Sequence, residues 1–128
     1  MRSSHSLILS AAKRNPVALK AFFGVTHKWG LSSEQERRLL NIPKATFYRW
    51  KQHLDGSLSP DTLERISYIL GIYKALRILL PTETMANQWI HKPNTAPLFG
   101  GNPALEKLMK GHVLDLADVR RYLDAERG

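Results

Sequence analysis

The stretch SEQERRLLNIPKATFYRWKQ at residues 33–52 constrains the fold more than any other part of this sequence. Apolar residues on both sides of its centre recur at the three- and four-residue spacing of amphipathic helices. Between them, Asn41 tolerates the left-handed backbone of a tight turn, and Pro43 can start a new helix without losing a useful donor. Two short helices joined by a turn of three or four residues form a helix-turn-helix, which we predict here.

Helical spacing continues outside this motif and no segment alternates with a period of two, so we expect an all-α fold without a sheet. We expect the first amphipathic helix to begin at Pro16, with residues 1–15 frayed, because proline suits the first turn of a helix. Ser33 and Glu36 have the spacing of a capping box, which predicts that the motif's first helix starts there. The other helices are expected over residues 44–54, 61–71, 82–89, 103–110 and 115–125, and we expect helix to resume between residue 75 and residue 80 after a break that follows residue 71.

Positive charge is concentrated in the N-terminal half of the chain. Residues 1–60 hold 10 Lys and Arg against 3 Asp and Glu, a net charge of +7, whereas residues 61–128 hold 9 against 8, a net charge of +1. This asymmetry indicates that the first half meets a polyanion and that the second half has another role. We therefore divide the chain into an N-terminal helical DNA-binding region, residues 1–80, and a C-terminal binding region, residues 81–128.

The second helix of the motif predicts a DNA-contacting face. Phe47, Trp50 and Leu54 share one side, which we expect to pack on apolar residues at 39, 40 and 42. A recognition helix reads the major groove with its N-terminal residues, and flanking cations contact phosphates. The residues expected near base edges are Lys44, Ala45, Tyr48, Arg49 and Gln52. Those expected at phosphates are Lys51, Arg37 and Arg38.

A helical hairpin with a merely solvated charged face is the alternative interpretation of this motif. Arg37 favours it, because such motifs usually hold a small residue at this position, against the second helix. We expect that crowding by Arg37 changes the angle between the two helices. The absence of any acid from residue 44 to residue 54 favours DNA binding instead.

No pattern of catalysis or metal binding is found in the sequence. The chain has no Cys, which excludes disulfides and the thiolate ligands of common zinc sites, and its five His form no i, i+4 pair. Gly100 and Gly101 are not followed by the Gly-Lys-Ser/Thr of a phosphate-binding loop. No apolar run approaches the roughly 20 residues of a membrane span, and residues 1–15 lack a cleavable signal. We expect a cytoplasmic binding protein, not an enzyme, without cofactor or metal.

The C-terminal half carries an apolar ridge, made of Leu105, Leu108, Met109, Val113, Leu116, Val119, Tyr122 and Leu123. It exceeds what one short helix pair can bury internally, so it is a candidate partner surface. Alternatively, the ridge closes the core of a single bundle. The charged tail that follows, from Arg120 to Arg127, either enters a partner's pocket or is a solvated helix end.

The order of residues over 89–128 resembles the C-terminal region of Xre/MbcA/ParS-type antitoxins, the partners of RES-domain toxins. The matching positions are Trp89, Pro93, Asn94, Leu98, Gly100, Gly101, Pro103, Leu105, Leu108, Gly111, Val119, Leu123, Glu126 and Gly128. With the helix-turn-helix and the segment around Ser59 to Arg65, the resemblance extends over about residues 30–128. Two departures stand out: Phe99 separates a leucine from the glycine pair, and Asp124-Ala125 replaces the usual arginine-isoleucine.

The resemblance implies an N-terminal Xre/Cro-like helix-turn-helix bundle followed by a small helical toxin-binding region. It implies a type II antitoxin that occludes the active site of an NAD-consuming RES-domain toxin encoded in the same operon. It also implies repression through operator DNA and a homodimer within a toxin–antitoxin hetero-oligomer. The implied toxin-binding residues are Trp89, Pro93, Leu98, Gly100, Gly101, Leu105, Leu108, Arg120, Arg121, Leu123, Glu126, Arg127 and Gly128.

Two other functions remain compatible with the sequence. The first is a stand-alone helix-turn-helix transcriptional regulator that dimerises through its C-terminal helices. The second is an adaptor that localises or regulates a partner and has lost DNA binding. A reading frame of RES type next to the gene would favour the antitoxin over both.

Overall fold

The computed structural model describes the backbone of residues 4–54 and 56–128, and the side chains from residue 15 onward within these ranges. This part of the chain is built from helices with no strand, which confirms the expected all-α fold; two extended residues, Pro93 and Pro103, form an isolated bridge. The helices are α1 (Ser4–Lys28), α2 (Ser33–Leu40), α3 (Lys44–His53), α4 (Pro60–Leu79), α5 (Glu83–Gln88), the 3-10 helix η1 (Trp89–His91), α6 (Ala104–Leu108) and α7 (Val113–Glu126).

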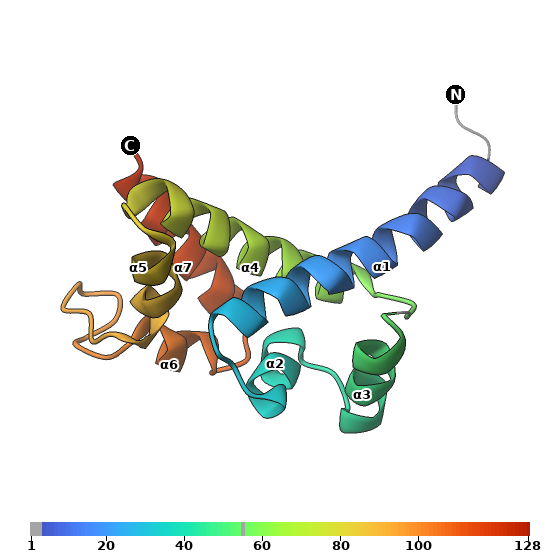
Figure 1. Cartoon of the computed structure of the whole chain (residues 1–128), viewed down its shortest axis with the longest axis horizontal. Coiled ribbons are helices and arrows are strands. Elements are labelled where there is room, and N and C mark those ends of the chain that lie inside the picture. The colour runs from blue at the N-terminus through green and yellow to red at the C-terminus, as the bar shows by residue number, and fades with distance from the viewer. Residues whose placement is uncertain (1–3, 55) are drawn as a thin grey trace.

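Two long helices, α1 and α4, frame the molecule (Figure 1). Helix α4 is the central element, because α1, α2, α5 and α7 all contact it. The short helices α2 and α3 lie on one side of this frame, and α5, η1 and α6 lie beside α7 at the other end. The helix-turn-helix and the C-terminal helices thus both pack on α4.

Helix α1 begins much earlier than predicted. It starts at Ser4 and runs through Pro16, so the expectation that the helix begins at Pro16 is wrong. The expectation of fraying is also wrong for residues 4–15, and residues 1–3 lie outside the described part of the chain. A proline inside a helix removes one hydrogen bond. The segment before it, LILSAAK, is rich in good helix formers, which favours continuation despite that loss.

The start of α2 is shifted by one residue from the prediction. The capping box is formed by Ser32 and Gln35: the Gln35 amide donates to Ser32 Oγ at 3.2 Å, and the Ser32 amide donates to Gln35 Oε1 at 2.8 Å. The predicted pair of Ser33 and Glu36 is therefore wrong. The Glu36 side chain is buried and is bonded to other parts of the fold, so it does not return to the helix start.

Helix α4 is continuous where the sequence suggested an interruption near residue 71. Gly71 is buried, and a Cβ atom built on it would lie 1.5 Å from Nη1 of Arg120 on α7. This glycine therefore leaves room for the Arg120 guanidinium and does not break the helix. At 20 residues, α4 is long enough to serve both halves of the chain.

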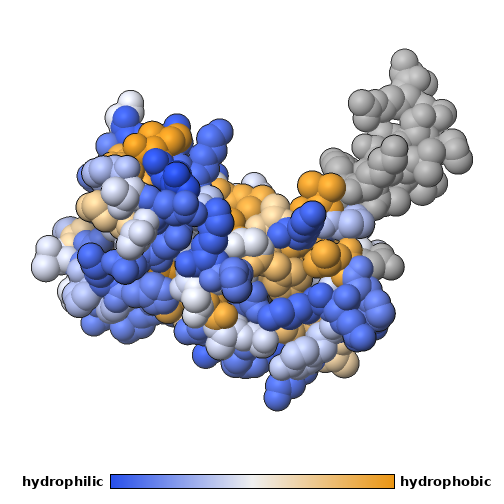
Figure 2. All heavy atoms as spheres, viewed as in Figure 1, coloured by the Kyte–Doolittle hydropathy of each residue, from blue (hydrophilic) through white to orange (hydrophobic). Residues whose placement is uncertain are grey.

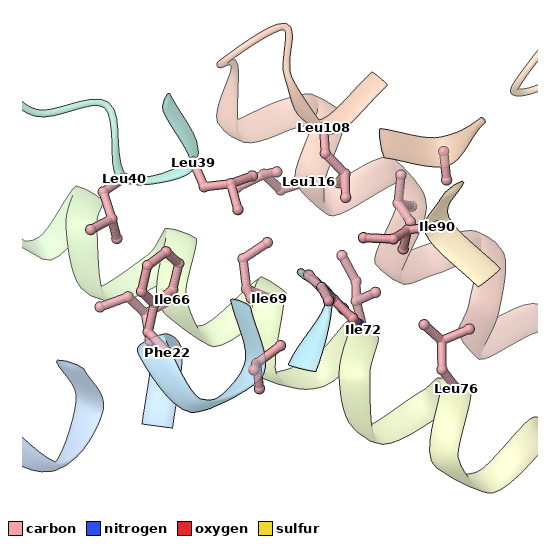
Figure 3. Close-up of a cluster of buried hydrophobic side chains, with 14 of the residues drawn as sticks. Phe22, Leu39, Leu40, Ile66, Ile69, Ile72, Leu76, Ile90, Leu108 and Leu116 are labelled. Carbon is pink, nitrogen blue, oxygen red and sulfur yellow. The ribbon is translucent and has the colours of Figure 1, made fainter. Parts of the chain in front are cut away.

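One hydrophobic core runs through both halves of the chain (Figure 3). Leu39 from α2, Leu108 from α6 and Leu116 from α7 converge on Ile69 and Ile72 of α4. The interpretation of the C-terminal apolar ridge as an exposed surface is accordingly wrong for most of it. Four of its members are buried and the other four are half-buried, because α4 supplies the apolar face that the short helix pair lacks.

Candidate functional surfaces

Helix α3 is fixed to the fold through one side. Phe47 and Trp50 are buried, as are the three apolar residues of α2 and the turn that were predicted to receive them. The Phe47 ring meets the edge of Phe23 on α1, with 5.9 Å between ring centroids. The turn also forms as expected, because Asn41 has a left-handed φ of 53° and its amide donates to Arg37 O at 2.8 Å. The helix-turn-helix of the sequence analysis is therefore confirmed.

The opposite side of α3 faces solvent. It carries the five residues predicted near base edges: Lys44, Ala45, Tyr48, Arg49 and Gln52. Across the described part of the chain, no ion pair engages Lys44 or Arg49. These two cations are therefore available for an external anion.

Lys51 is placed differently from the other basic residues of α3. Its Nζ donates to Glu36 Oε1 at 2.6 Å and to Ser33 Oγ at 3.1 Å, and it lies 5.6 Å from the ring centroids of both Phe23 and Phe47. Glu36 is only 3% exposed, so its charge is compensated by this lysine and by the Thr26 hydroxyl. In this conformation Lys51 joins α3 to α2 and is not extended toward a phosphate.

Arg37 stabilises the turn and does not crowd it. Its guanidinium pairs with Glu34 and donates from Nη1 to Ile42 O at 3.0 Å. The hydrogen bond from Arg37 holds the pKa of the Glu34 carboxyl below its ordinary value. The sequence predicted that Arg37 crowds the second helix. Instead, its guanidinium bonds Glu34 within α2 and the Ile42 carbonyl in the turn. Arg38, one residue later, is exposed.

The glycine pair lies in a loop that closes on itself between η1 and α6. The Gly101 amide donates to Asn94 O at 2.8 Å, and the Asn94 amide donates to Asn102 O at 3.2 Å. Gly100 and Gly101 have φ of 59° and 90°, a backbone region that strongly favours glycine. The backbone conformation of the loop therefore accounts for both glycines.

Phe99 anchors this loop to the C-terminal helix. It is buried and meets the edges of Trp89 and Tyr122, at centroid distances of 5.8 and 5.2 Å. The sequence analysis treated this residue only as a departure from a family pattern. The sequence could have indicated this anchor, because Phe99 is the only aromatic residue in the loop NTAPLFGGNP, which is rich in glycine and proline.

An apolar pocket of about 240 Å³ lies next to this aromatic cluster. It brings together three of the implied toxin-binding residues, Trp89, Leu123 and Glu126, with Tyr122 and three leucines near the end of α4. The complete lining is Leu76, Leu79, Leu80, Trp89, Tyr122, Leu123 and Glu126. An apolar pocket with one carboxylate at the end of the chain suits a partner side chain better than a charged small molecule.

Two family models match the chain in succession. The antitoxin Xre-like helix-turn-helix domain matches residues 9–71, and the antitoxin Xre/MbcA/ParS C-terminal toxin-binding domain matches residues 75–128. The chain belongs to the Xre/MbcA/ParS-type antitoxins. It is also similar to the protein y4oB of Sinorhizobium fredii, with 45% identity over 120 residues that span 93% of this chain and 91% of the relative.

Both matched models describe binding domains of antitoxins and not enzymes. Their boundary, between residues 71 and 75, falls inside α4, so this antitoxin uses one helix for both domains. The sequence-based division at residue 80 falls at the end of the same helix. None of the helices in the described residues is long and apolar enough to cross a membrane, and the described side chains form no cluster of His, Asp and Glu suited to a metal ion.

The structure separates the predicted toxin-binding residues of the antitoxin by exposure. Leu108 and Leu123 lie in the core, so they hold α6 and α7 in place and offer no surface of their own. Trp89, Leu105 and Arg120 are half-buried. The exposed members are Pro93, Leu98, Gly100, Gly101, Arg121, Glu126, Arg127 and Gly128.

The arginines of the tail are paired within α7. Arg120 Nε lies 3.0 Å from Asp124 Oδ2, Arg127 Nη1 lies 3.7 Å from Asp124 Oδ1, and Arg121 pairs with Asp118. Arg120, Asp124, Arg127 and Gly128 line an open pocket of about 390 Å³. Exposed pairs of this kind contribute roughly 0–1 kcal/mol each, so a partner can replace them at small cost.

Proposed function

We propose that this antitoxin binds and occludes the active site of a RES-domain toxin that consumes NAD and is encoded in the same operon, and that it represses this operon through α3. The observation that carries the proposal is the coexistence, on one core, of an unpaired basic face on α3 and a C-terminal toxin-binding domain. We place this activity in the cytoplasm, where operator DNA and NAD are found together.

The DNA-binding half of the proposal rests on Lys44 and Arg49. A bidentate base contact contributes about 1–3 kcal/mol and a phosphate contact about fivefold in affinity at 0.15 M salt, so the double variant Lys44→Ala/Arg49→Ala is expected to weaken binding to the operon's upstream DNA at least about 30-fold. Capture of the toxin is expected to persist. A control with the same loss of charge, Lys20→Ala/Lys74→Ala, removes exposed lysines of α1 and α4 and is expected to bind DNA nearly as well. Loss of both activities in the α3 variant would mean that the motif is structural.

The toxin-binding half rests on the exposed members of the C-terminal set. Leu98→Asp places a charge on the glycine loop at a side chain that is 37% exposed, and it is expected to abolish rescue of growth when toxin and antitoxin are co-expressed. Leu114→Asp is the matched control, because Leu114 is on α7, is 69% exposed and lies outside the predicted set. Rescue by Leu98→Asp together with failure of Leu114→Asp would move the toxin surface to the start of α7.

We also propose a homodimer within the toxin–antitoxin assembly. An apolar groove of about 370 Å³ between α1 and α4 supports it, since its lining contains no polar side chain: Val17, Ala18, Ala21, Leu63 and Leu70. Figure 2 displays apolar surface where the middle of α1 passes the start of α4. Val17→Glu is expected to convert the dimer to a monomer in size-exclusion chromatography with light scattering. An unchanged mass would place the dimer interface elsewhere.

The stand-alone regulator that dimerises through its C-terminal helices receives less support. The apolar residues at 116, 119 and 123 of α7 are buried against the rest of the chain, and α4 is its main neighbour. A second copy would have to use what remains exposed on this helix, which is largely charged. Co-purification of the neighbouring gene product with the antitoxin distinguishes the two functions directly.

A further inference from the structure

The loop between α6 and α7 lies beside the end of α2 (Figure 1). Together they line a pocket of about 280 Å³ that combines both domains. Arg37, Arg38 and Asn41 come from the helix-turn-helix, and Lys110, Gly111 and His112 come from the toxin-binding domain. Residues separated by about 70 positions in the sequence thus form one surface.

A buried arginine fixes this arrangement. Arg65 of α4 is 5% exposed, and its Nη1 donates to Gly111 O at 3.0 Å and to Leu39 O at 3.4 Å. The same guanidinium therefore holds the α6–α7 loop and the last turn of α2. Since Gly111 is clamped in this way, Lys110 and His112 on either side of it are held next to Arg38.

The charge of this pocket is not balanced within the chain. No carboxylate lines it, and among the described residues neither Arg38 nor Lys110 forms an ion pair. The nearby acids Glu34 and Asp115 are paired with Arg37 and Lys107, respectively. The N-terminus of α7 also opens here without a side-chain cap, which adds partial positive charge. Cations held together without an acid favour an external anion.

We propose that this pocket binds a phosphate of the DNA backbone beside the groove that α3 enters, so that the toxin-binding domain contributes directly to DNA binding. The inference rests on the proposed function of α3. Helix α3, helix α2 and the α6–α7 loop follow one another along the same edge of the molecule (Figure 1). In a helix-turn-helix the first helix crosses the DNA backbone, which brings Arg38 and the loop toward the phosphates next to the groove.

The cations of α3 and the cations of the pocket lie close to one another, which supports one continuous DNA-binding surface. The pKa of Glu34 is lowered mainly by its bond with Arg37 and, to a smaller extent, by the charges of Lys44 and Arg38. Lys44 at the start of α3 and Arg38 in the pocket therefore both lie near Glu34. Arg38 also lines the pocket with Lys110, so it is common to both groups of cations.

The test is the salt dependence of DNA binding by the variants Lys110→Ala and Lys110→Gln, with Lys74→Ala as a control of equal charge outside the pocket. Fluorescence anisotropy is measured with a labelled duplex from the region upstream of the gene and with a duplex of unrelated sequence. Loss of one phosphate contact reduces the slope of log K against log[salt] by about 0.9 and the affinity about fivefold at 0.15 M salt. We expect this reduction on both duplexes for both pocket variants and no change for Lys74→Ala.

The possible outcomes separate this inference from the proposed function. If the wild-type antitoxin binds neither duplex, the DNA-binding function fails and the inference fails with it. If the wild type binds and Lys110→Ala and Lys110→Gln keep its slope, the inference alone is overturned. If these variants lose toxin capture and retain DNA binding, the pocket faces the toxin and the inference is likewise overturned. Thermal unfolding confirms that each variant is folded, and Lys110→Gln keeps the aliphatic stem in case the alanine variant is unstable.

Discussion

Replacing Arg65 by methionine removes a guanidinium that joins three parts of the chain. Arg65 bonds Asp61 within α4 at 2.9 Å, the α2 carbonyl of Leu39 at 3.4 Å and the loop carbonyl of Gly111 at 3.0 Å. Methionine keeps most of the apolar stem, so the substitution tests the hydrogen bonds and not the packing. The two carbonyls have no other side chain to accept from in the described structure, so both lose a donor.

The expected loss follows from how well each partner is solvated. Asp61 is 54% exposed, so water replaces the ion pair and its loss costs no more than about 0.5 kcal/mol. A buried carbonyl without a donor costs about 1–3 kcal/mol. The bond to the buried Leu39 carbonyl is long and the Gly111 carbonyl is only part-buried, so each belongs in the lower half of that range. Arg65→Met is therefore expected to lower the free energy of unfolding by about 2–3 kcal/mol.

Urea unfolding followed by circular dichroism and tryptophan fluorescence measures this loss. Because both domains share one core, the two signals are expected to change together in a single transition. Glu64→Gln, which changes an exposed carboxylate of the same helix, is the control and is expected to cost less than about 0.5 kcal/mol. A loss for Arg65→Met no larger than that of the control would refute the argument that the guanidinium joins the two domains.

Three further predictions concern helix packing, a buried charge and acid stability. Gly71→Ala is expected to displace the Arg120 guanidinium, so its gain of about 0.5–1 kcal/mol in urea unfolding is expected in an Arg120→Ala variant and is expected to be smaller in the wild type; equal effects in both backgrounds would contradict the contact. Glu36→Gln is expected to cost about 1–3 kcal/mol, since its carboxylate is buried under two donors, and an equal cost for the exposed Glu34→Gln would contradict this. Burial alone would raise the pKa of Asp118, but hydrogen bonds from an arginine and a lysine lower this pKa overall. The ionised Asp118 therefore stabilises the fold fully above the ordinary pKa of 3.8, and this stabilisation is lost as the pH falls through the lower pKa of the folded state. Asp118→Asn is expected to flatten the acid limb of stability against pH, and an unchanged limb would show that the carboxyl does not contribute.

Local sequence was sufficient for the helix-turn-helix. The period of its apolar residues, the left-handed Asn41 and the break at Pro43 act within a few residues of each other, and the observed turn follows them. The start of α2 was missed by one residue because Ser32 and Ser33 both suit a cap by local rules. The choice was made by Glu36, whose carboxylate bonds Thr26 and Lys51 from other helices.

The order of residues over 89–128 was likewise sufficient to indicate a toxin-binding domain, since the family pattern is carried by the glycines, prolines and leucines themselves. It did not indicate which of them are surface. Leu108 and Leu123 match the pattern because they build the core, whereas Leu98 matches it on an exposed loop. A pattern of residue types does not distinguish these two reasons for a match.

The sequence by itself determined the all-α class, the helix-turn-helix and the family, but not where α1 and α2 begin or that α4 is continuous. The motif and the family pattern depend on residue types and their order along the chain. Only the tertiary structure decided that α4 serves both domains and that half of the C-terminal apolar ridge is buried and the other half is half-buried. It alone brought Arg38 and Lys110 into one pocket, through the bonds of Arg65. The physical reason is that burial and charge pairing depend on which helix faces meet in space, and the spacing of residues within one helix does not encode its neighbour.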